Sequence, residues 1–538
     1  MGLLSRERIV AGPGFNRWLV PPAALAVHLC IGMAYGFSVF WLPLSRAIGI
    51  REPLACPPEM PFLATVLTST CDWPISMLGW MYTLFFVVLG GSAALFGSWL
   101  ERAGPRKAGV VAALCWCGGL CVSALGVHTH AIGLLWLGSG VIGGVGLGLG
   151  YISPVSTLIK WFPDRRGMAT GMAIMGFGGG AMIGAPLADS LMRFFATPNS
   201  VGVAETFLTL AAIYAVFMLA GSFGYRVPAP GWSPEGFTAP ASSRGGMMTS
   251  GHVHPAVAWK TPQFWLLWWV LCLNVTAGIG VIGMASPMLQ EVFGGRLLGG
   301  ASRFDELSAA QKGQIAAIAA GFTGLLSLFN IAGRIAWASW SDRIGRKPTY
   351  TVFFALGLAL YVSAPASGHA GLVAVFVATF CLIVSMYGGG FATVPAYLAD
   401  LFGTQMVGAI HGRLLTAWSA AGIFGPVVVN YLREYQLAHG VERARVYDIT
   451  LYILGGLLVA GLACNLLVRP VDVRYHMTAA QLDAASGSRA EAKAVPATQT
   501  RPLVSSSRLL VLGAWLAVAI PLSWGCLTTL AKAWVLLR

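Results

Sequence analysis

One arginine lies deep within an apolar stretch of the chain, where it is well suited to bind an anion. Arg334 belongs to the segment FNIAGRIAWASWSDRIGRKPTY at residues 329–350, and it precedes the charge cluster that starts at Asp342 by eight positions. Because a helix rises about 1.5 Å per residue, Arg334 is expected about 12 Å from the helix end, toward the middle of a membrane. A cation there is costly unless it faces a partner or a cavity. Arg334 is therefore a candidate anion-binding residue.

Three tyrosines could line the same site. Tyr35, Tyr151 and Tyr387 lie within apolar stretches, and each stands beside a glycine. A tyrosine ring suits core packing and its hydroxyl suits a polar ligand, so both interpretations are open for each one alone. Together with Arg334, the three fit a pocket for a small anion better. The two lone histidines in such stretches, His28 and His411, are expected to have structural roles.

The sequence lacks the patterns that are typical of enzymes. It contains no metal-ligand spacing, no GxSxG nucleophile turn and no GxxxxGK[ST] phosphate loop. A formal GxGxxG at Gly138, Gly140 and Gly143 lies in an apolar stretch, where close helix packing explains it better than dinucleotide binding. We therefore expect neither an enzyme nor a cofactor or metal. The predicted spans carry no Asp or Glu near their middle, which favours exchange or facilitated passage of an anion over proton coupling.

A short charged loop occurs twice in the chain. ERAG at residues 101–104 matches DRIG at residues 342–345 at an offset of 241 positions, and Pro154 matches Pro395 at the same offset. The repeat predicts two related halves, which is typical of transporters whose site lies between the halves. We expect the loop charges to latch one conformation. The candidates are Glu101, Arg102, Asp342, Arg343, Arg346 and Lys347.

Composition and apolar runs predict an all-α integral membrane protein. Of 538 residues, 56% are hydrophobic and 10% are charged, which is too apolar for a soluble protein. Spans are predicted near residues 18–46, 76–99, 108–127, 131–157, 168–192, 206–225, 262–288, 313–340, 349–367, 371–397, 407–431 and 448–468, with a further run at 509–531. The predicted parts are a six-helix bundle at 1–225, a connector at 226–261, a second six-helix bundle at 262–469, a linker at 470–507 and an extra transmembrane helix at 508–538.

The distribution of charge predicts the orientation in the membrane. The net charge of +14 comes from basic residues spread over short loops, so a lipid bilayer explains it better than nucleic acid does. Basic residues gather in alternate loops, which places the N-terminus, the connector and the linker in the cytoplasm. The first apolar run is longer than a signal-peptide core, so no cleaved signal peptide is expected. Cys56 and Cys71 flank a proline-rich outer loop, where a disulfide and two free thiols both remain open.

Two long segments resemble one family of membrane carriers. GYISPVSTLIKWFPDRRGMATGMAIMGFGGGA (residues 150–181) and YGGGFATVPAYLADLFGTQMVGAIHGRLLTAWSAAGIFGP (residues 387–426) resemble the oxalate/formate antiporter family of the major facilitator superfamily. The resemblance covers about residues 17–469, and the C-terminal run resembles a small one-span subunit found with some bacterial members. It implies a twelve-helix fold in a bacterial inner membrane and small carboxylates as substrates. We expect a monomer.

The resemblance also implies roles for two positions. In the family's oxalate exchanger, an arginine of span 8 and a lysine of span 11 hold the two carboxylates. Arg334 matches the arginine, whereas Trp418, in TAWSAAGIFG, stands at the lysine position. One cation would leave a dianion poorly neutralised, which favours a monocarboxylate such as formate, lactate or pyruvate. The alternatives are strict oxalate/formate exchange, a membrane sensor that does not transport, and a membrane-embedded enzyme.

Overall fold

In the part of the chain that the structure describes, the regular secondary structure is helical apart from isolated β-bridges. The computed structural model describes residues 2–50, 54, 56–57, 60–67, 70–229, 232–236, 247–300, 302–486 and 508–533. Within these residues, 12 helical segments are long and apolar enough to cross a membrane, and the last of them is Arg508–Leu530. A further long helix, α12 (Ala309–Ile344), has 36 residues and carries Arg334. These helices confirm the predicted all-α membrane fold with an additional C-terminal helix.

The N-terminal half begins with a broken helix. α1 (Val20–Ile31) passes into a 3₁₀ stretch, Gly32–Phe40, which contains Tyr35, and then into α2 (Trp41–Leu44). The other spans of this half are α4 (Ile75–Ala103), α5 (Pro105–His128), α6 (Ile132–Leu135) with α7 (Gly144–Trp161), α8 (Arg166–Phe195) and α9 (Val203–Gly224). A π-helical stretch, Trp136–Gly143, joins α6 to α7.

The C-terminal half has a matching set of spans, but its first and fourth spans are continuous helices. Its spans are α11 (Pro262–Phe293), α12, α13 (Arg346–His369), α14 (Val373–Phe402), α15 (Val407–Leu414) with α16 (Thr416–Ala438), and α17 (Asp448–Leu467). One tight turn joins the second and third spans of each half, with a φ of 86° at Gly104 and 91° at Gly345. Glycine adopts such angles without steric cost. The two matching loops of the sequence therefore share one backbone conformation.

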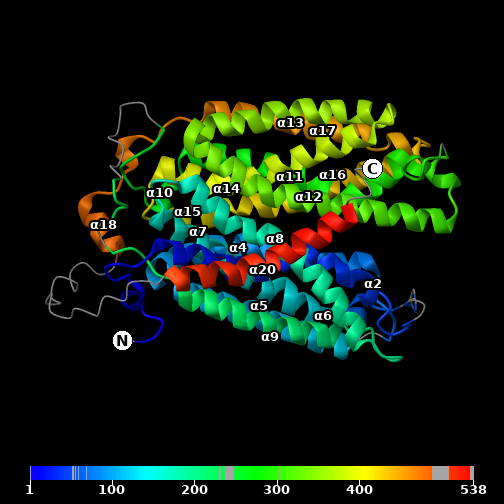
Figure 1. The fold of residues 1–538 in the computed structure, drawn as a ribbon, viewed down its shortest axis with the longest axis horizontal. Coiled ribbons are helices and arrows are strands. Elements are labelled where there is room, and N and C mark those ends of the chain that lie inside the picture. The colour runs from blue at the N-terminus through cyan, green and yellow to red at the C-terminus, as the bar shows by residue number, and fades with distance from the viewer. Residues whose placement is uncertain are drawn as a thin grey trace.

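The two halves lie side by side, and α20 (Arg508–Ala533) runs along their boundary (Figure 1). α20 packs against α1 and α8 of the N-terminal half and against α12 of the C-terminal half. The short helices α10 (Pro255–Ala258) and α18 (Ala479–Ser486) lie at the end of the molecule that holds the N-terminus (Figure 1). We call this end the connector side. The opposite end, with α2 and α6, is the loop side.

Glycines of the fourth span allow close packing of helices. A side-chain carbon at Gly146 would lie 2.6 Å from the backbone nitrogen of Trp116 in α5, and one at Gly144 would lie 2.8 Å from the Cβ of Val88 in α4. No side chain fits at such distances. The structure therefore confirms packing as the explanation of this glycine run.

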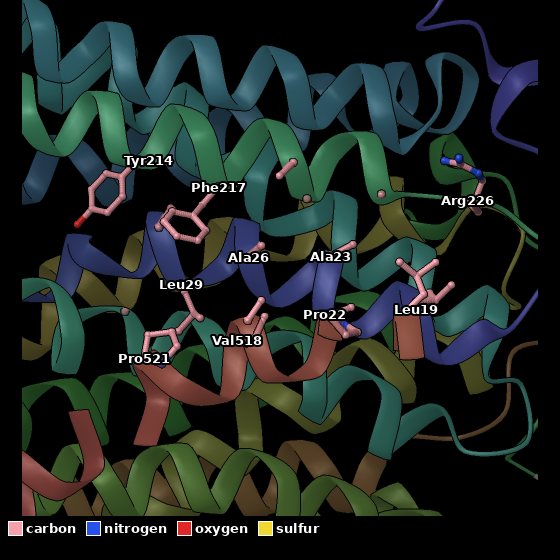
Figure 2. A pocket seen from close by; sticks show the side chains of 18 of the residues that line it. Leu19, Pro22, Ala23, Ala26, Leu29, Tyr214, Phe217, Arg226, Val518 and Pro521 are labelled. Carbon is pink, nitrogen blue, oxygen red and sulfur yellow. The ribbon is translucent and has the colours of Figure 1, made fainter. Parts of the chain in front are cut away.

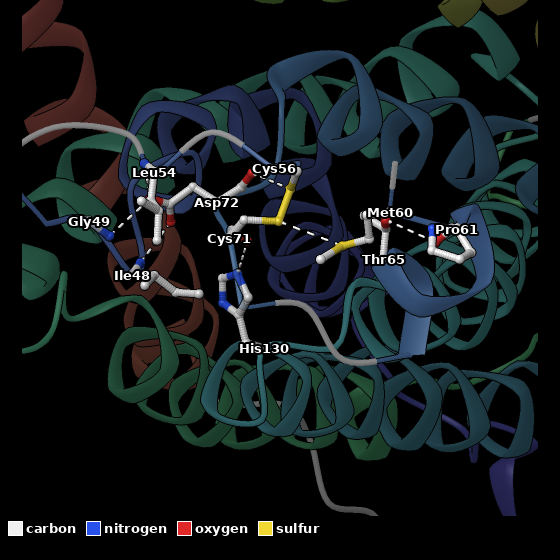
Figure 3. Close-up of a disulfide and its surroundings, with 10 residues drawn as sticks. All are labelled: Ile48, Gly49, Leu54, Cys56, Met60, Pro61, Thr65, Cys71, Asp72 and His130. Carbon is white, nitrogen blue, oxygen red and sulfur yellow. Dashed lines mark hydrogen bonds between the residues drawn. A yellow bond between two sulfur atoms is a disulfide. The ribbon is translucent and has the colours of Figure 1, made fainter. Parts of the chain in front are cut away.

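A disulfide and an aspartate hold the loop between the first two spans (Figure 3). Cys56 is bonded to Cys71, so the disulfide alternative is confirmed. The Asp72 carboxylate accepts hydrogen bonds from the backbone nitrogens of Ile48 (2.7 Å), Gly49 (2.9 Å) and Leu54 (2.9 Å). His130, which follows α5, is bonded through Nε2 to the Cys71 backbone oxygen at 2.9 Å. The loop, which includes the short α3 (Phe62–Leu67), is thus tied to the bundle.

Candidate functional site

Arg334 lies at the boundary between the halves and is fully buried, with 0% of its surface exposed. Its Nε donates a hydrogen bond to the side-chain oxygen of Asn330 at 2.9 Å, one turn earlier on α12. Its Nη1 donates to the backbone oxygen of Ile174, in α8 of the other half, at 3.0 Å. Its Nη2 is buried and has no hydrogen-bond partner within the described part of the chain. An arginine fork with an unused amino group can receive a carboxylate.

Glycines of α8 make room for this cation. A side-chain carbon at Gly178 would lie 3.2 Å from the Nε of Arg334 and 3.3 Å from Cγ1 of Ile331. At Gly171, such a carbon would lie 2.6 Å from the backbone oxygen of Arg334. Because these positions are glycines, α8 and α12 approach closely enough for Arg334 to reach across the boundary.

Trp418 of α16 lies at the centre of an aromatic cluster. Ring centroids lie around it at 4.5 Å (Phe391), 5.3 Å (Phe86), 5.3 Å (Tyr151), 5.4 Å (Phe177) and 6.2 Å (Tyr35). The Arg334 guanidinium lies 5.6 Å from the ring centre of Phe391, within cation–π range. The Tyr35 and Tyr387 hydroxyls, from opposite halves, are 3.3 Å apart. The structure thus brings the five predicted substrate-binding residues into one cluster.

Three polar groups of this cluster lack hydrogen-bond partners among the described residues. They are Nη2 of Arg334, the hydroxyl of Tyr151 and the indole nitrogen of Trp418. Tyr151 lies within electrostatic range of Arg334, and all three side chains are 0% exposed. A buried polar group without a partner costs about 1–3 kcal/mol, so three in one cluster need an explanation. A small anion would accept hydrogen bonds from such groups and would balance the charge of the arginine.

Sequence reasoning did not identify several residues of this site. Asn330 had a usable signal, because it stands four positions before Arg334 on the same helix face. The phenylalanines had none, because apolar residues fill every span and only tertiary packing selects those beside Trp418. The structural role expected of His28 fits its contacts, since its two ring nitrogens lie 2.5 Å and 3.1 Å from backbone oxygens. His411 is buried at 5.9 Å from the Tyr151 ring, and neither of its nitrogens has a partner among the described residues.

Glu101, at the end of α4, joins the halves on the connector side. It accepts a hydrogen bond at 3.0 Å from the backbone nitrogen of Gly408, in the first turn of α15. It also accepts one from Ser156 at 2.9 Å and pairs with Lys160 at 2.5 Å, both within its own half. The positive end of a helix dipole stabilises a carboxylate. Glu101 therefore ties the N-terminal half to a helix of the other half.

Asp342, at the end of α12, makes the matching contact in the opposite direction. It accepts hydrogen bonds from the backbone nitrogen of Gly167 at 2.8 Å and of the next residue at 2.9 Å, in the first turn of α8. Arg346 pairs with Asp342 at 2.6 Å and with Asp400 at 3.1 Å, and Arg166 of the N-terminal half pairs with Asp400 at 2.8 Å. This second contact between the halves is therefore a network of charges that spans the boundary.

The other predicted latch residues lie elsewhere. Arg102 and Arg343 are exposed. Lys347 donates hydrogen bonds to the backbone oxygens of Leu466 at 2.7 Å and Val468 at 2.9 Å, at the end of α17 in its own half. Of the six predicted latch residues, the structure brings Glu101, Asp342 and Arg346 to the boundary.

Comparisons with known proteins agree with this architecture. The family model described as Major Facilitator Superfamily matches residues 24–426 and 307–537. The oxalate:formate antiporter of Oxalobacter formigenes is 25% identical over 415 residues, which cover 76% of this chain and 83% of that protein. The apicoplast pyruvate carrier 1 of Toxoplasma gondii is 26% identical over 350 residues, which cover 56% of this chain and 60% of that protein.

Solved structures show the same fold. The proton:xylose symporter XylE matches with a TM-score of 0.58 and 17% identity, over 84% of this chain and 95% of that chain. At this identity the likeness supports the fold alone. Since the family model matches most of the chain and the helices form two matching halves, the protein belongs to the Major Facilitator Superfamily of membrane transporters.

Proposed function

We propose that the protein carries small carboxylates across the bacterial inner membrane by alternating access, with Arg334 as the residue that binds the carboxylate. The observation that carries this proposal is the group of unpartnered polar atoms on Arg334, Tyr151 and Trp418 at the boundary between the halves. A carboxylate suits such a site, because it is small and accepts several hydrogen bonds. Two relatives whose names state oxalate, formate or pyruvate as substrates support the same chemical class.

The positions of the latches support movement of one half against the other. Glu101 and Asp342 each accept hydrogen bonds from the first turn of a helix in the opposite half, on the connector side. Breaking these contacts would open that side, while Arg334, farther along α12, stays at the boundary. Substrate could then leave toward the connector side, which the positive-inside rule assigns to the cytoplasm. We further propose exchange or facilitated passage, because the predicted spans lack a carboxylate near their middle.

A monocarboxylate is the substrate that this site favours. Arg334 is the cation that interacts electrostatically with all three tyrosines of the cluster, Tyr35, Tyr151 and Tyr387. One guanidinium balances one carboxylate, and a second negative charge in the same pocket would remain unpaired at considerable cost. Trp418 offers an N–H donor and bulk but no charge. Formate, lactate and pyruvate are therefore favoured over oxalate.

Strict oxalate/formate exchange is the second candidate. Its support is Arg413 of α15, five positions before Trp418, whose Nη1 is buried without a partner among the described residues. If Arg413 turned toward the substrate, it would supply the second cation that a dicarboxylate needs.

Transport into proteoliposomes tests the proposal. Purified protein is reconstituted with internal formate, and uptake of labelled formate, lactate, pyruvate and oxalate is compared with that of empty liposomes. We expect uptake of monocarboxylates, with oxalate competing weakly. Preferred uptake of oxalate would support the second candidate. Absence of uptake for all four acids, from either side and without internal substrate, would contradict a carboxylate carrier and leave the sensor alternative.

A further inference from the structure

A long apolar cavity of about 1100 Å³ lies between α20 and the helices α1, α8 and α9, apart from the Arg334 site (Figure 2). Its walls include Leu19, Ala26, Leu29, Phe217, Val518 and Pro521. We call this cavity the α20 slot. Its volume exceeds the roughly 300–1,000 Å³ of pockets for small molecules. The slot therefore suits a larger and mainly apolar ligand.

The length of the α20 slot matches one leaflet of a bilayer. Its lining extends over residues 19–30 at α1, 213–224 of α9 and 510–521 of α20. Eleven helical steps rise about 16 Å. Half of a bilayer's hydrocarbon core is about 15 Å thick. A ligand that fills the slot would extend from the membrane surface to its middle.

One end of the α20 slot is basic. Arg8 and Arg226 line it there, and Figure 2 shows Arg226 at the Leu19 end, far from Tyr214 and Pro521. Arg106 lies within electrostatic range of both arginines, so the positive charge at this end is concentrated. None of the described residues that line the slot is acidic. An apolar slot with one basic end fits an amphiphile whose head group is an anion.

We propose that an anionic phospholipid occupies the α20 slot, with its phosphate beside Arg8 and Arg226 and its acyl chains along α20. Basic residues at the membrane surface attract anionic head groups. Burial of the acyl chains against the apolar walls adds favourable binding free energy through the hydrophobic effect. A soluble phosphate has no apolar surface to bury, so the apolar walls would not add to its binding free energy. This inference goes beyond the proposed function, since it requires only a membrane protein and does not depend on the substrate.

The lipid would complete the contacts of α20 with the N-terminal half. On the connector side, the indole nitrogen of Trp515 donates a hydrogen bond to the backbone oxygen of Trp18 at 3.1 Å, which fixes α20 beside the start of α1. Phe217, which lines the slot from α9, is 46% exposed. Acyl chains in the slot would cover this ring and fill the space between α9 and α20.

A photoreactive lipid tests the proposal. The full-length protein is placed in nanodiscs of phosphatidylcholine with a small share of phosphatidylglycerol that carries a diazirine on one acyl chain, and labelled peptides are identified by mass spectrometry. We expect labels on α9 and α20 at slot positions. Since each basic residue at the surface adds about a fivefold preference for anionic lipid, Arg8→Gln with Arg226→Gln should lower this labelling strongly.

Two further variants make the outcome decisive. Lys260→Gln removes an exposed positive charge on the connector side, away from the slot, and should leave the labelling unchanged. Ala514→Trp places an indole on the α20 wall of the slot and should block labelling without any change of charge. Equal labelling by a phosphatidylcholine probe, or labelling that survives both the arginine and the tryptophan variants, would overturn the proposal and indicate ordinary surrounding lipid.

Discussion

At the scale of single residues, Arg334 makes two hydrogen bonds, to Asn330 and Ile174, and its Nη2 has no partner among the described residues, so we propose that Nη2 binds the carboxylate. Arg334→Ala should therefore abolish carboxylate uptake, because the charge that attracts the anion is lost. Arg334→Lys keeps a charge but loses the planar fork, and loss of a hydrogen bond to a charged group should lower uptake roughly ten- to a hundredfold. Initial uptake rates at equal amounts of reconstituted protein measure both effects. Arg193→Ala, an exposed arginine of α8, is the control.

Normal uptake by Arg334→Ala would exclude Arg334 as the binding residue. Removal of a buried side chain also endangers folding, so thermal unfolding in detergent must accompany the uptake measurement. A variant that retains the melting temperature of the parent and loses uptake supports a binding role.

The residue at position 418, which is Trp418, should determine whether the protein prefers monocarboxylates or dicarboxylates. Trp418→Lys places a second cation in the cluster around Arg334. The affinity for oxalate should therefore rise relative to the affinity for formate and lactate. The measurement is the ratio of inhibition constants when each acid competes with labelled formate. Trp418→Phe keeps an aromatic ring but removes the indole nitrogen, and it should preserve the parent's ranking. An unchanged ranking in Trp418→Lys would mean that residue 418 does not face the substrate.

Residues differ in how far the sequence alone could predict them. Arg334 was predictable as a candidate anion-binding residue, because a cation in an apolar run is costly in any helical membrane fold unless it has a partner. The cluster of Tyr35, Tyr151, Tyr387 and Trp418 was predictable as a set of candidates. Its central arrangement around Trp418 was not, since ring contacts join residues from several helical segments that are far apart in the chain. The sequence also could not predict which charged loop residues contact the other half, because Glu101 bonds a backbone nitrogen 307 positions away.

At the scale of elements, the two proposed latches, at Glu101 and Asp342, each bond a carboxylate to the first turn of a helix in the opposite half, but they differ in the number of charges. Asp342→Asn should loosen the connector side more than Glu101→Gln does, because Asp342 also holds Arg346, which shares Asp400 with Arg166. The reporter is Thr170→Cys, at a buried threonine whose hydroxyl donates to the Ala392 backbone oxygen at 2.6 Å. In a background without free cysteines, a membrane-impermeant maleimide added from the connector side should label it several-fold faster in Asp342→Asn.

The exposed pair on α8 gives the control for this latch. Asp189→Asn removes the same charge from an aspartate that pairs with Arg193 on the loop side, so the labelling rate of the Thr170→Cys reporter should not change. Equal rates in Asp342→Asn and in the parent would show that the helix-end contact of Asp342 does not hold the connector side closed.

α20 should place the C-terminus on the side opposite to the N-terminus. Thirteen predicted spans, an odd number, require this if the N-terminus is cytoplasmic. A reporter enzyme that is active only in the periplasm should be active when fused after residue 538. The same reporter fused after residue 486, before α20, should be inactive. Activity of the second fusion alone would reverse the predicted orientation.

At the scale of the whole molecule, the repeat in the sequence predicted the two halves because matching loops occur at a constant offset. The position of α20 was not predictable in the same way. It was expected as an appendage, since it has no counterpart in the repeat. The sequence of an isolated apolar run does not indicate which helices it packs against. The structure lays it against α8 of one half and α12 of the other. Small residues explain the fit, since Gly324 faces Thr529 and Gly525 faces Met182.

Alternating access requires the halves to rock against each other. Because α20 contacts both halves, it must lose its contacts with one of them during this movement. A side-chain carbon at Gly324 would lie 3.8 Å from the Cβ of Thr529, which is the usual spacing of a disulfide, and one at Gly525 would lie 3.2 Å from Cγ of Met182. Gly324→Cys with Thr529→Cys would tether α20 to α12. Gly525→Cys with Met182→Cys would tether it to α8.

In a background whose free cysteines are replaced, we expect each tether alone to leave carboxylate uptake near the parent rate, because α20 can then move with one half. Both tethers together should arrest uptake, since α8 and α12 become linked through α20, and a reductant should restore it. The parent treated with the same reductant controls for reduction of the bond between Cys56 and Cys71. Uptake at the parent rate with both disulfides formed would mean that α8 and α12 do not move apart, and rocking about this boundary would have to be abandoned.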